Sequence, residues 1–166
     1  MSARVAVVIP WFGRALRGGA EEFAWQEATR LARRGHAVEV LATCGAAFQA
    51  DWGADHHPPG PSEEDGVTVR RFRLRRRDRA AFDEANRRLL AVPKATLRPG
   101  VSPVDDTTAD AFVRENVHAP GLLEHLERHG AGYDAVLFLP YLYGPTLLGV
   151  DRVAERAWLQ PCLHDE

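Results

Sequence analysis

A glycine-rich loop is the part of this sequence best suited to holding a phosphate. Gly18 and Gly19 stand directly before a predicted helix, where backbone can approach a ligand without a Cβ in the way. Free N–H groups and the positive end of the helix dipole favour an anion there. Gly13 and Gly18 have the spacing of a P-loop, but Gly19 and Ala20 stand where a P-loop carries Lys and Ser or Thr. The loop therefore predicts a phosphate contact without NTPase chemistry.

Two observations weigh against this interpretation of the loop. A Gly-Gly pair between a strand and a helix also serves simply as a turn. Glu21 and Glu22 lie in the first turn of the predicted helix and would repel an anion unless their side chains point away. The G-x-G-x-x-G spacing of dinucleotide-binding loops is absent.

Aromatic residues in the same loop suggest a second kind of contact. Trp11 and Phe12 precede the glycines, and we consider them, with Glu21, candidate substrate-binding residues in which the aromatic rings stack on a sugar. The alternative is that both rings belong to the core or its rim, where large aromatic side chains are usually found.

Candidate metal ligands elsewhere have simpler explanations. Asp105 and Asp106 precede two threonines and a helical pattern, so a helix N-cap accounts for them. His56 and His57, beside Asp55, lie in a Pro-rich segment without a third ligand at metal-site spacing. We predict no metal site and no cofactor.

Seven arginines are crowded between positions 70 and 79. They are Arg70, Arg71, Arg73, Arg75, Arg76, Arg77 and Arg79. A nucleic-acid surface would need interleaved aromatic residues, and only Phe72 is near. We predict no nucleic-acid partner and leave two interpretations: a solvated edge paired with Glu63, Glu64, Asp65, Asp78 and Asp83, or a surface that docks an anionic acceptor or the membrane that carries it.

The elements that must position these residues alternate between strand and helix. Residues 5–10 form a continuous apolar run typical of a buried strand, and 20–34 show the apolar stripe of an amphipathic helix. Gly35 predicts a helix cap, and 36–43 predict a second strand. Strand, glycine loop, helix and strand in this order make a βαβ unit.

The rest of the chain continues the alternation. Strands are expected at 67–74, 133–140 and 157–163, and helices at 78–90, 105–117, 120–130 and 146–153, whereas 45–66 are loop-like. The pattern predicts an α/β fold with a doubly wound, mostly parallel, Rossmann-like sheet. Ligands bind such sheets at the carboxyl ends of the strands, which indicates loop 11–19 and His164, Asp165 and Glu166 after the last strand.

Composition sets the broader class. A chain of 166 residues fits one domain, and a net charge of −2 gives no overall attraction to nucleic acid or membrane. Cys44 and Cys162 are far apart and outside any C-x-x-C pair, so we expect reduced, buried thiols. The N-terminus lacks the apolar segment of a signal peptide, and no apolar run has membrane-spanning length, which predicts a cytoplasmic protein.

Several segments together resemble glycosyltransferase family 4, whose GT-B enzymes have two doubly wound domains facing across a cleft. The most specific are the turn Gly18-Gly19-Ala20-Glu21 and the ending Pro161-Cys162-Leu163-His164-Asp165-Glu166. Further similarity lies in residues 5–10, 31–44, 51–52, 66–72 and 133–143. The similarity is patchy but spans nearly the whole chain.

The resemblance implies a role for each matched residue. Gly18 and Gly19 would lie near the diphosphate of a nucleotide-sugar donor. His164 would contact the transferred sugar or the reacting centre, and Asp165 and Glu166 would orient it or shape the acceptor site, so we assign these three as candidate catalytic residues. GT-B enzymes need no metal, which agrees with the lack of a metal motif.

The resemblance also implies what the protein does. We expect the N-terminal, acceptor-side domain, residues 1–166, of a retaining, metal-independent hexosyltransferase. Its partners would be a nucleotide-sugar donor and a glycan, lipid or small-molecule acceptor, with peripheral contact at the inner membrane face as one further expectation. The donor would be held mostly by a C-terminal domain beyond Glu166, so we expect the chain to be truncated. The alternative is a stand-alone nucleotide- or phosphate-binding module without catalysis.

Overall fold

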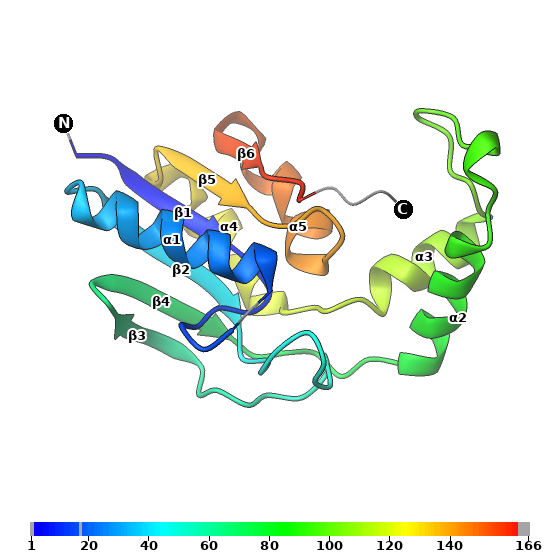
Figure 1. Cartoon of the computed structure of the whole chain (residues 1–166), viewed down its shortest axis with the longest axis horizontal. Helices are drawn as coiled ribbons and strands as arrows, with labels where there is room; N and C mark the ends of the chain where they lie inside the picture. Colours follow the sequence, from blue (N-terminus) through cyan, green and yellow to red (C-terminus); the bar gives the residue numbers. More distant parts are fainter. Residues whose placement is uncertain (1, 17, 163–166) are drawn as a thin grey trace.

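The protein is an α/β fold built on one six-stranded sheet. The computed structural model describes residues 2–16 and 18–162 (Figure 1). The strands are β1 (Arg4–Val8), β2 (Ala37–Thr43), β3 (Gly60–Glu64), β4 (Val67–Phe72), β5 (Ala135–Phe138) and β6 (Ala157–Leu159). Their order is β3-β4-β2-β1-β5-β6, and every neighbouring pair is parallel except β3 and β4. The predicted doubly wound, mostly parallel sheet is confirmed.

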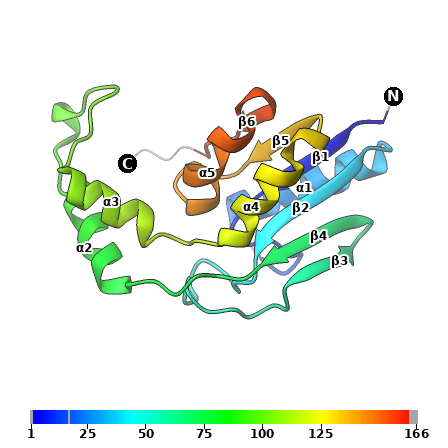
Figure 2. The same cartoon turned by 180° about the vertical axis from the view of Figure 1, so that it is seen from behind.

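Helices cover both faces of this sheet. The helices of the described residues are α1 (Gly19–Arg33), α2 (Arg79–Leu90), α3 (Asp106–Arg114), α4 (Pro120–His129) and α5 (Gly144–Gly149), with short 3-10 segments η1 (Lys94–Thr96), η2 (Gly130–Gly132) and η3 (Val150–Arg156). Helices α2 and α3 project away from the sheet (Figure 1). Helix α1 packs on one face through Ala24 and Ala28, and α4 packs on the other through Leu122 and Leu126 (Figures 1 and 2). None of the helices in residues 2–16 and 18–162 is long and apolar enough to cross a membrane.

Helix boundaries follow the capping residues. Helix α1 ends in a Schellman motif: Gly35 N–H donates to Ala32 O at 2.9 Å and His36 N–H to Leu31 O at 3.2 Å. Gly35 has a φ of 85°, a conformation that favours glycine. Asp105 accepts from Thr108 N–H at 3.0 Å, which confirms it as the N-cap of α3.

The segment 45–66, expected to be loop, contains strand β3. Residues Gly60–Glu64 pair antiparallel with β4 at the sheet edge. The hairpin closes at Asp65 and Gly66, with φ values of 48° and 79°, as a two-residue turn of the type that Asp-Gly favours. The expectation was wrong because β3 is short and polar; its turn was the available signal. The five expected strands are all found and are shorter than expected, most of all β5, which spans four residues, and β6, which spans three.

A buried polar cluster lies between β2 and α4. Glu39 accepts from the Tyr133 hydroxyl at 2.6 Å and from Arg70 Nε at 2.7 Å. Because the Tyr133 hydroxyl donates to Glu39, its oxygen accepts from His125 Nε2, 3.0 Å away. Burial would raise the pKa of Glu39, but the hydrogen bonds from Tyr133 and Arg70 outweigh it and hold that pKa below its usual range. Burial lowers the pKa of His125.

These shifts predict a fold that loses stability in mild acid. The lowered pKa of His125 means that the unfolded chain, with an ordinary histidine pKa of 6.5, binds a proton that the folded chain does not, so stability falls as pH drops below that value. The lowered pKa of Glu39 acts at lower pH, because its contribution is lost only below the ordinary carboxylate value of 4.5. We expect the urea midpoint to fall as pH drops from about 7 towards 5. His125→Gln should reduce this pH dependence, and His129→Gln, an exposed neighbour, should not. Identical midpoints at both pH values for the unmodified chain would contradict the expectation.

Candidate functional site

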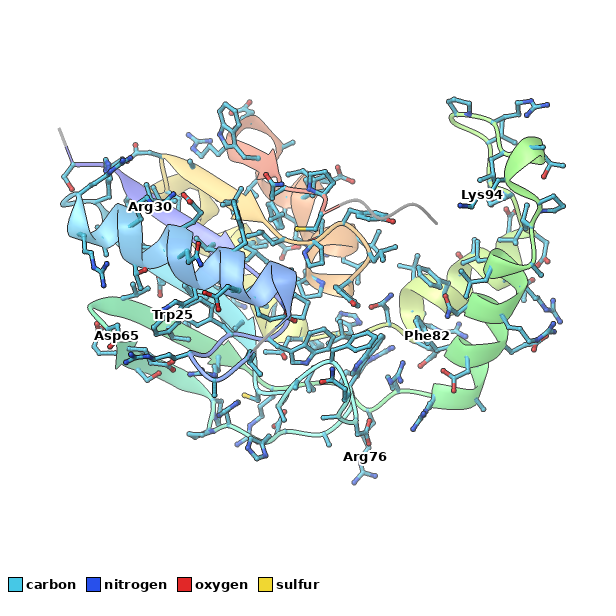
Figure 3. The ribbon with its side chains drawn as sticks, in the orientation of Figure 1. Trp25, Arg30, Asp65, Arg76, Phe82 and Lys94 are labelled. Carbon is cyan, nitrogen blue, oxygen red and sulfur yellow. The ribbon has the colours of Figure 1, made fainter. Side chains whose placement is uncertain are left out.

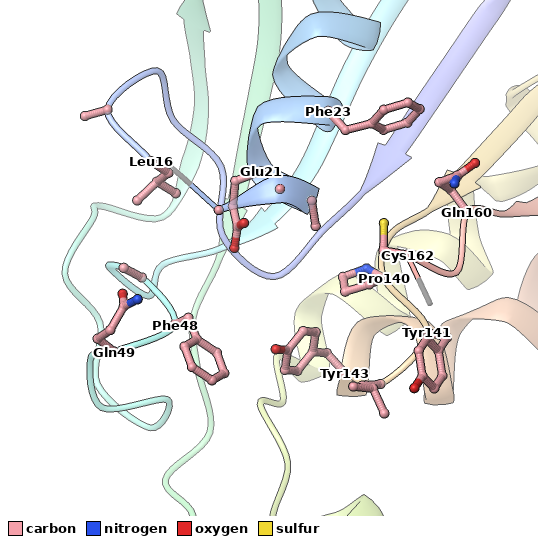
Figure 4. A pocket seen from close by; sticks show the side chains of 16 residues that line it. Leu16, Glu21, Phe23, Phe48, Gln49, Pro140, Tyr141, Tyr143, Gln160 and Cys162 are labelled. Atoms are coloured by element: carbon pink, nitrogen blue, oxygen red, sulfur yellow. The ribbon is translucent and has the colours of Figure 1, made fainter. Parts of the chain in front are cut away.

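A cleft of about 780 Å³ opens at the carboxyl ends of the strands (Figure 4). It lies where the strand order reverses, because β1 is flanked by β2 on one side and β5 on the other. The loops after β1, β2, β5 and β6 supply its walls. The residues that line it are Ala15, Leu16, Gly18, Gly19, Ala20, Glu21, Phe23, Ala47, Phe48, Gln49, Pro140, Tyr141, Leu142, Tyr143, Gln160 and Cys162. This is the place at which open α/β sheets bind ligands.

The start of α1 forms one wall. Gly18 is the N-cap, with a φ of −74°, a ψ of 151° and no capping side chain, and both Gly18 and Gly19 are exposed. A Cβ added at Gly19 would meet no atom within 4 Å, whereas one added at Gly18 would collide with the Glu21 carboxylate. The backbone is therefore open to a ligand at Gly19, and Gly18 leaves room for Glu21 to fold back.

The two acidic residues of the first turn of α1 behave differently. Glu22 accepts from Gln26 Nε2 at 2.8 Å. Glu21 points toward the aromatic side chains of Phe48 and Tyr143 (Figure 4) and lines the cleft. Since Glu21 does not point away, its charge opposes an anion bound at the start of this helix, and it is also placed to accept hydrogen bonds from ligand hydroxyl groups.

The opposite wall is aromatic. Phe48, from the loop after β2, is 50% exposed, and its ring lies 6.5 Å from the ring of Tyr143, from the loop after β5. Trp52 fixes this loop by donating from Nε1 to Phe48 O at 2.7 Å. Sequence reasoning did not single out Phe48 or Tyr143. Their place after β2 and β5, the two strands that flank β1, was the signal that could have found them.

Trp11 and Phe12 support the cleft from beneath its surface. Trp11 is 1% exposed, and its ring centroid lies 5.1 Å from Tyr143 and 6.0 Å from Phe48. Phe12 is 3% exposed and packs against Trp25 at 5.4 Å. Neither ring lines the cleft in this arrangement, and the aromatic side chains that line it are Phe23, Phe48, Tyr141 and Tyr143.

Arg71 ties the glycine loop to the sheet. Its Nη2 donates to Phe12 O at 2.9 Å, and Nη1 lies 2.8 Å from Glu64 Oε1. The residue is 7% exposed, although it belongs to the arginine run that sequence reasoning assigned to a surface. It faces the α1 side because it follows Val67 and Val69 at alternate positions of β4.

The other arginines of the run mostly meet acidic partners. Arg70 pairs with Glu39, Arg73 with Asp55, Arg75 with Glu115 and Arg79 with Asp83. Arg77 lies over the Trp52 ring, 4.7 Å from its centroid. Among the expected partners, Glu64 and Asp83 are confirmed; Glu63 instead accepts from Thr68, Asp65 pairs with Arg14, and Asp78 caps α2. Charge pairing within the domain thus explains most of the run.

The two thiols are unpaired and poorly ionised. Cys44 is fully buried, and burial raises its pKa to about 11. Cys162 lines the cleft, and burial followed by the nearby Glu21 charge raises its pKa. A thiol with a raised pKa is a weak nucleophile at neutral pH. Within residues 2–16 and 18–162, no group of three or more His, Cys, Asp or Glu could hold a metal ion. His164, Asp165 and Glu166 lie outside the described residues.

Comparison with known proteins adds a likeness of fold. No protein-family model matches the chain, and no curated protein matches its sequence. Among solved structures, the chain is similar to a GT-B glycosyltransferase described as trehalose-6-phosphate from E. coli bound with UDP-2-fluoro glucose. The TM-score is 0.47 and the identity 15%, over 93% of this chain and 30% of that one. Similarity at this level does not show family 4 and carries no argument about function.

Proposed function

We propose that this chain is the acceptor-side domain of a retaining, metal-independent glycosyltransferase that moves a hexose from a nucleotide sugar to a glycan, lipid or small-molecule acceptor. One observation carries the proposal: a cleft at the switch point of the sheet joins an open helix N-terminus to an exposed aromatic wall. The first wall suits a phosphate and the second suits a sugar ring.

The lining of the cleft favours a neutral acceptor. Among the described residues that line it, Glu21 is the only charged side chain, and the uncharged polar side chains include Gln49 and Gln160. Amide and carboxylate groups beside aromatic faces match a ligand that has many hydroxyl groups and an apolar ring surface. We assign Glu21 to acceptor hydroxyls and Phe48 and Tyr143 to stacking.

Gly18 and Gly19 support the donor side of the proposal. Their exposed backbone can approach the departing diphosphate, where negative charge develops during transfer. The Glu21 carboxylate opposes this charge, so bound donor must either be held away from it or shift its side chain. We further propose that a second domain beyond Glu166 grips the rest of the donor, and that His164, Asp165 and Glu166 act at the reacting centre.

The alternative function is a binding module for a nucleotide or phosphorylated ligand. The open backbone at Gly19 favours it, because a phosphate could bind there without any chemistry. The exposed aromatic wall does not by itself separate the two functions, because a nucleotide base can stack on Phe48 as a sugar ring can. The two functions differ in whether a nucleotide sugar is consumed and a saccharide acceptor is used.

Removing the Phe48 ring is expected to impair use of the acceptor. In the protein expressed to its natural stop codon, Phe48→Ala should lower kcat/KM for a saccharide acceptor about tenfold, because a half-exposed aromatic side chain can still bury roughly half of its area against a ligand. Hydrolysis of the donor by water should change little. The measurement is initial rate against acceptor concentration.

Two controls separate stacking from folding. Phe48→Leu keeps apolar volume without a ring and should recover only part of the loss. Trp158→Ala truncates an aromatic residue that is 67% exposed but does not line the cleft, and it should leave kcat/KM unchanged. Equal losses in Phe48→Ala and Trp158→Ala would remove the support for an acceptor at the aromatic wall.

A further inference from the structure

A helical hairpin projects from the domain. Helices α2 and α3 run side by side away from the sheet, and residues 91–105 connect them at the far end (Figures 1 and 2). The base of the hairpin is held by stacked rings, Phe82 and Phe112, whose centroids lie 5.2 Å apart. We call residues 90–104 the hairpin tip.

The hairpin tip is both apolar and exposed. Every residue from 93 to 103 is exposed, and the large apolar side chains include Leu90 at 68%, Leu97 at 45% and Val101 at 66%. A single exposed apolar residue is ordinary. Three at one protruding end, accompanied by three prolines and two further valines within residues 90–104, make a surface that water solvates poorly.

Charge on the hairpin is segregated along its length. No acidic residue occurs from 85 to 104, whereas Asp83, Glu84, Asp105 and Asp106 stand nearer the base. The cations of this stretch are Arg87, Arg88, Lys94 and Arg98. Arg87 and Arg88 pair with Glu84. Residues 90–104 include Lys94, labelled in Figure 3, and Arg98 but no acidic residue, so the sequence of the tip has a net positive charge.

Local hydrogen bonds give the tip a shape of its own. The Thr96 hydroxyl donates to Pro93 O at 2.7 Å, and Ser102 donates to Val104 O at 2.8 Å. Arg98 Nη1 donates to Ala95 O at 3.0 Å and to Leu97 O at 2.8 Å. The guanidinium of Arg98 therefore stays beside the apolar side chains and has no acidic partner among the described residues.

We propose that the hairpin tip docks on the surface of an anionic lipid bilayer, with Leu90, Leu97 and Val101 entering the interface. Apolar side chains bind the boundary between headgroups and acyl chains, and adjacent cations bind anionic headgroups. A protein partner is the less favoured occupant, because the tip is a convex protrusion with cations and no acidic residue, which matches a negatively charged plane. The surface is distinct from the cleft, so the proposal does not depend on sugar transfer.

Vesicle cosedimentation of the protein expressed to its natural stop codon tests this. The probes are vesicles of phosphatidylcholine and vesicles of phosphatidylcholine mixed equally with phosphatidylglycerol. We expect binding to the mixed vesicles to be about tenfold stronger, and to weaken as salt is added. The double substitution Leu90→Ser with Val101→Ser should reduce binding to the mixed vesicles about tenfold, and Arg98→Glu should reduce it severalfold.

Matched variants distinguish the tip from general surface effects. Trp158→Ser with Leu159→Ser removes two exposed apolar side chains from β6, and Arg128→Glu makes the same charge change on α4. Both should bind like the unmodified chain, and circular dichroism confirms that each variant is folded. Binding that is the same for tip and control variants, or the absence of binding to mixed vesicles, would overturn the proposal. Self-association of the chain that the tip substitutions abolish, without vesicle binding, would assign the tip to a second copy instead.

Discussion

Gly144→Ala is expected to leave little folded protein. An added Cβ would overlap the carbonyl oxygen of Val117 and lie 3.0 Å from its carbonyl carbon, so backbone would have to move on one side or the other. The same junction is held by Asn116, 1% exposed, whose Oδ1 accepts from Gly144 N–H at 3.1 Å and whose Nδ2 donates to Leu142 O at 3.1 Å. We expect a loss of more than about 3 kcal/mol in the free energy of unfolding.

Urea unfolding followed by circular dichroism measures this effect. Gly13→Ala is the matched control, because an added Cβ there meets no atom within 4 Å and its backbone is not in the left-handed region. That variant should lie within about 0.5 kcal/mol of the unmodified chain. A Gly144→Ala variant as stable as Gly13→Ala would show that segments 117 and 144 do not approach in this way, and the wall of the cleft carrying Tyr143 would need a different position.

Arg71→Met is the second substitution with a large expected effect. It removes both the ion pair to Glu64 and the donor to Phe12 O, and it leaves a partly buried carboxylate without its partner. Breaking a buried pair from one side costs about 3 kcal/mol or more. We expect that loss in urea unfolding, together with faster amide exchange in residues 11–16, because Arg71 ties that loop to β4.

The control for this change is Arg79→Met. Arg79 is exposed and lies 3.4 Å from Asp83, four residues along α2. An exposed pair of this kind contributes about 0.5 kcal/mol at most, so the variant should be close to the unmodified chain. If Arg71→Met and Arg79→Met have the same stability, Arg71 is not the anchor of the glycine loop.

Periodicity and capping predicted most of the fold. The run of β-branched residues at β1, the stripe on α1 and Gly35 at its end are local signals, and each was confirmed. Strand β3 was missed because its residues are polar and its stability comes from pairing with β4 rather than from burial. The Asp65-Gly66 turn is the one local feature that indicated it.

The candidate site was less accessible to sequence reasoning. Loop 11–19 was located because the carboxyl end of β1 is fixed by topology. Phe48 and Tyr143 were not, because their meeting depends on two loops far apart in the chain. Arg71 was predicted to lie on the surface because it stands among other arginines in the sequence. Side chains alternate between the two faces of β4, so Arg70 and Arg71 point to opposite faces and Arg71 is buried. Contacts of this kind need the tertiary structure.

Nucleotide release is the measurement that tests the proposed sugar transfer most directly. The protein expressed to its natural stop codon is offered UDP-, GDP- and ADP-sugars, alone and with saccharide acceptors, beside a variant with His164→Ala. We predict that one donor is consumed, that an acceptor raises the rate, and that the His164 variant loses most of it. If no donor is consumed while a nucleotide still binds, the transferase proposal is contradicted and the binding module becomes the better account of the cleft.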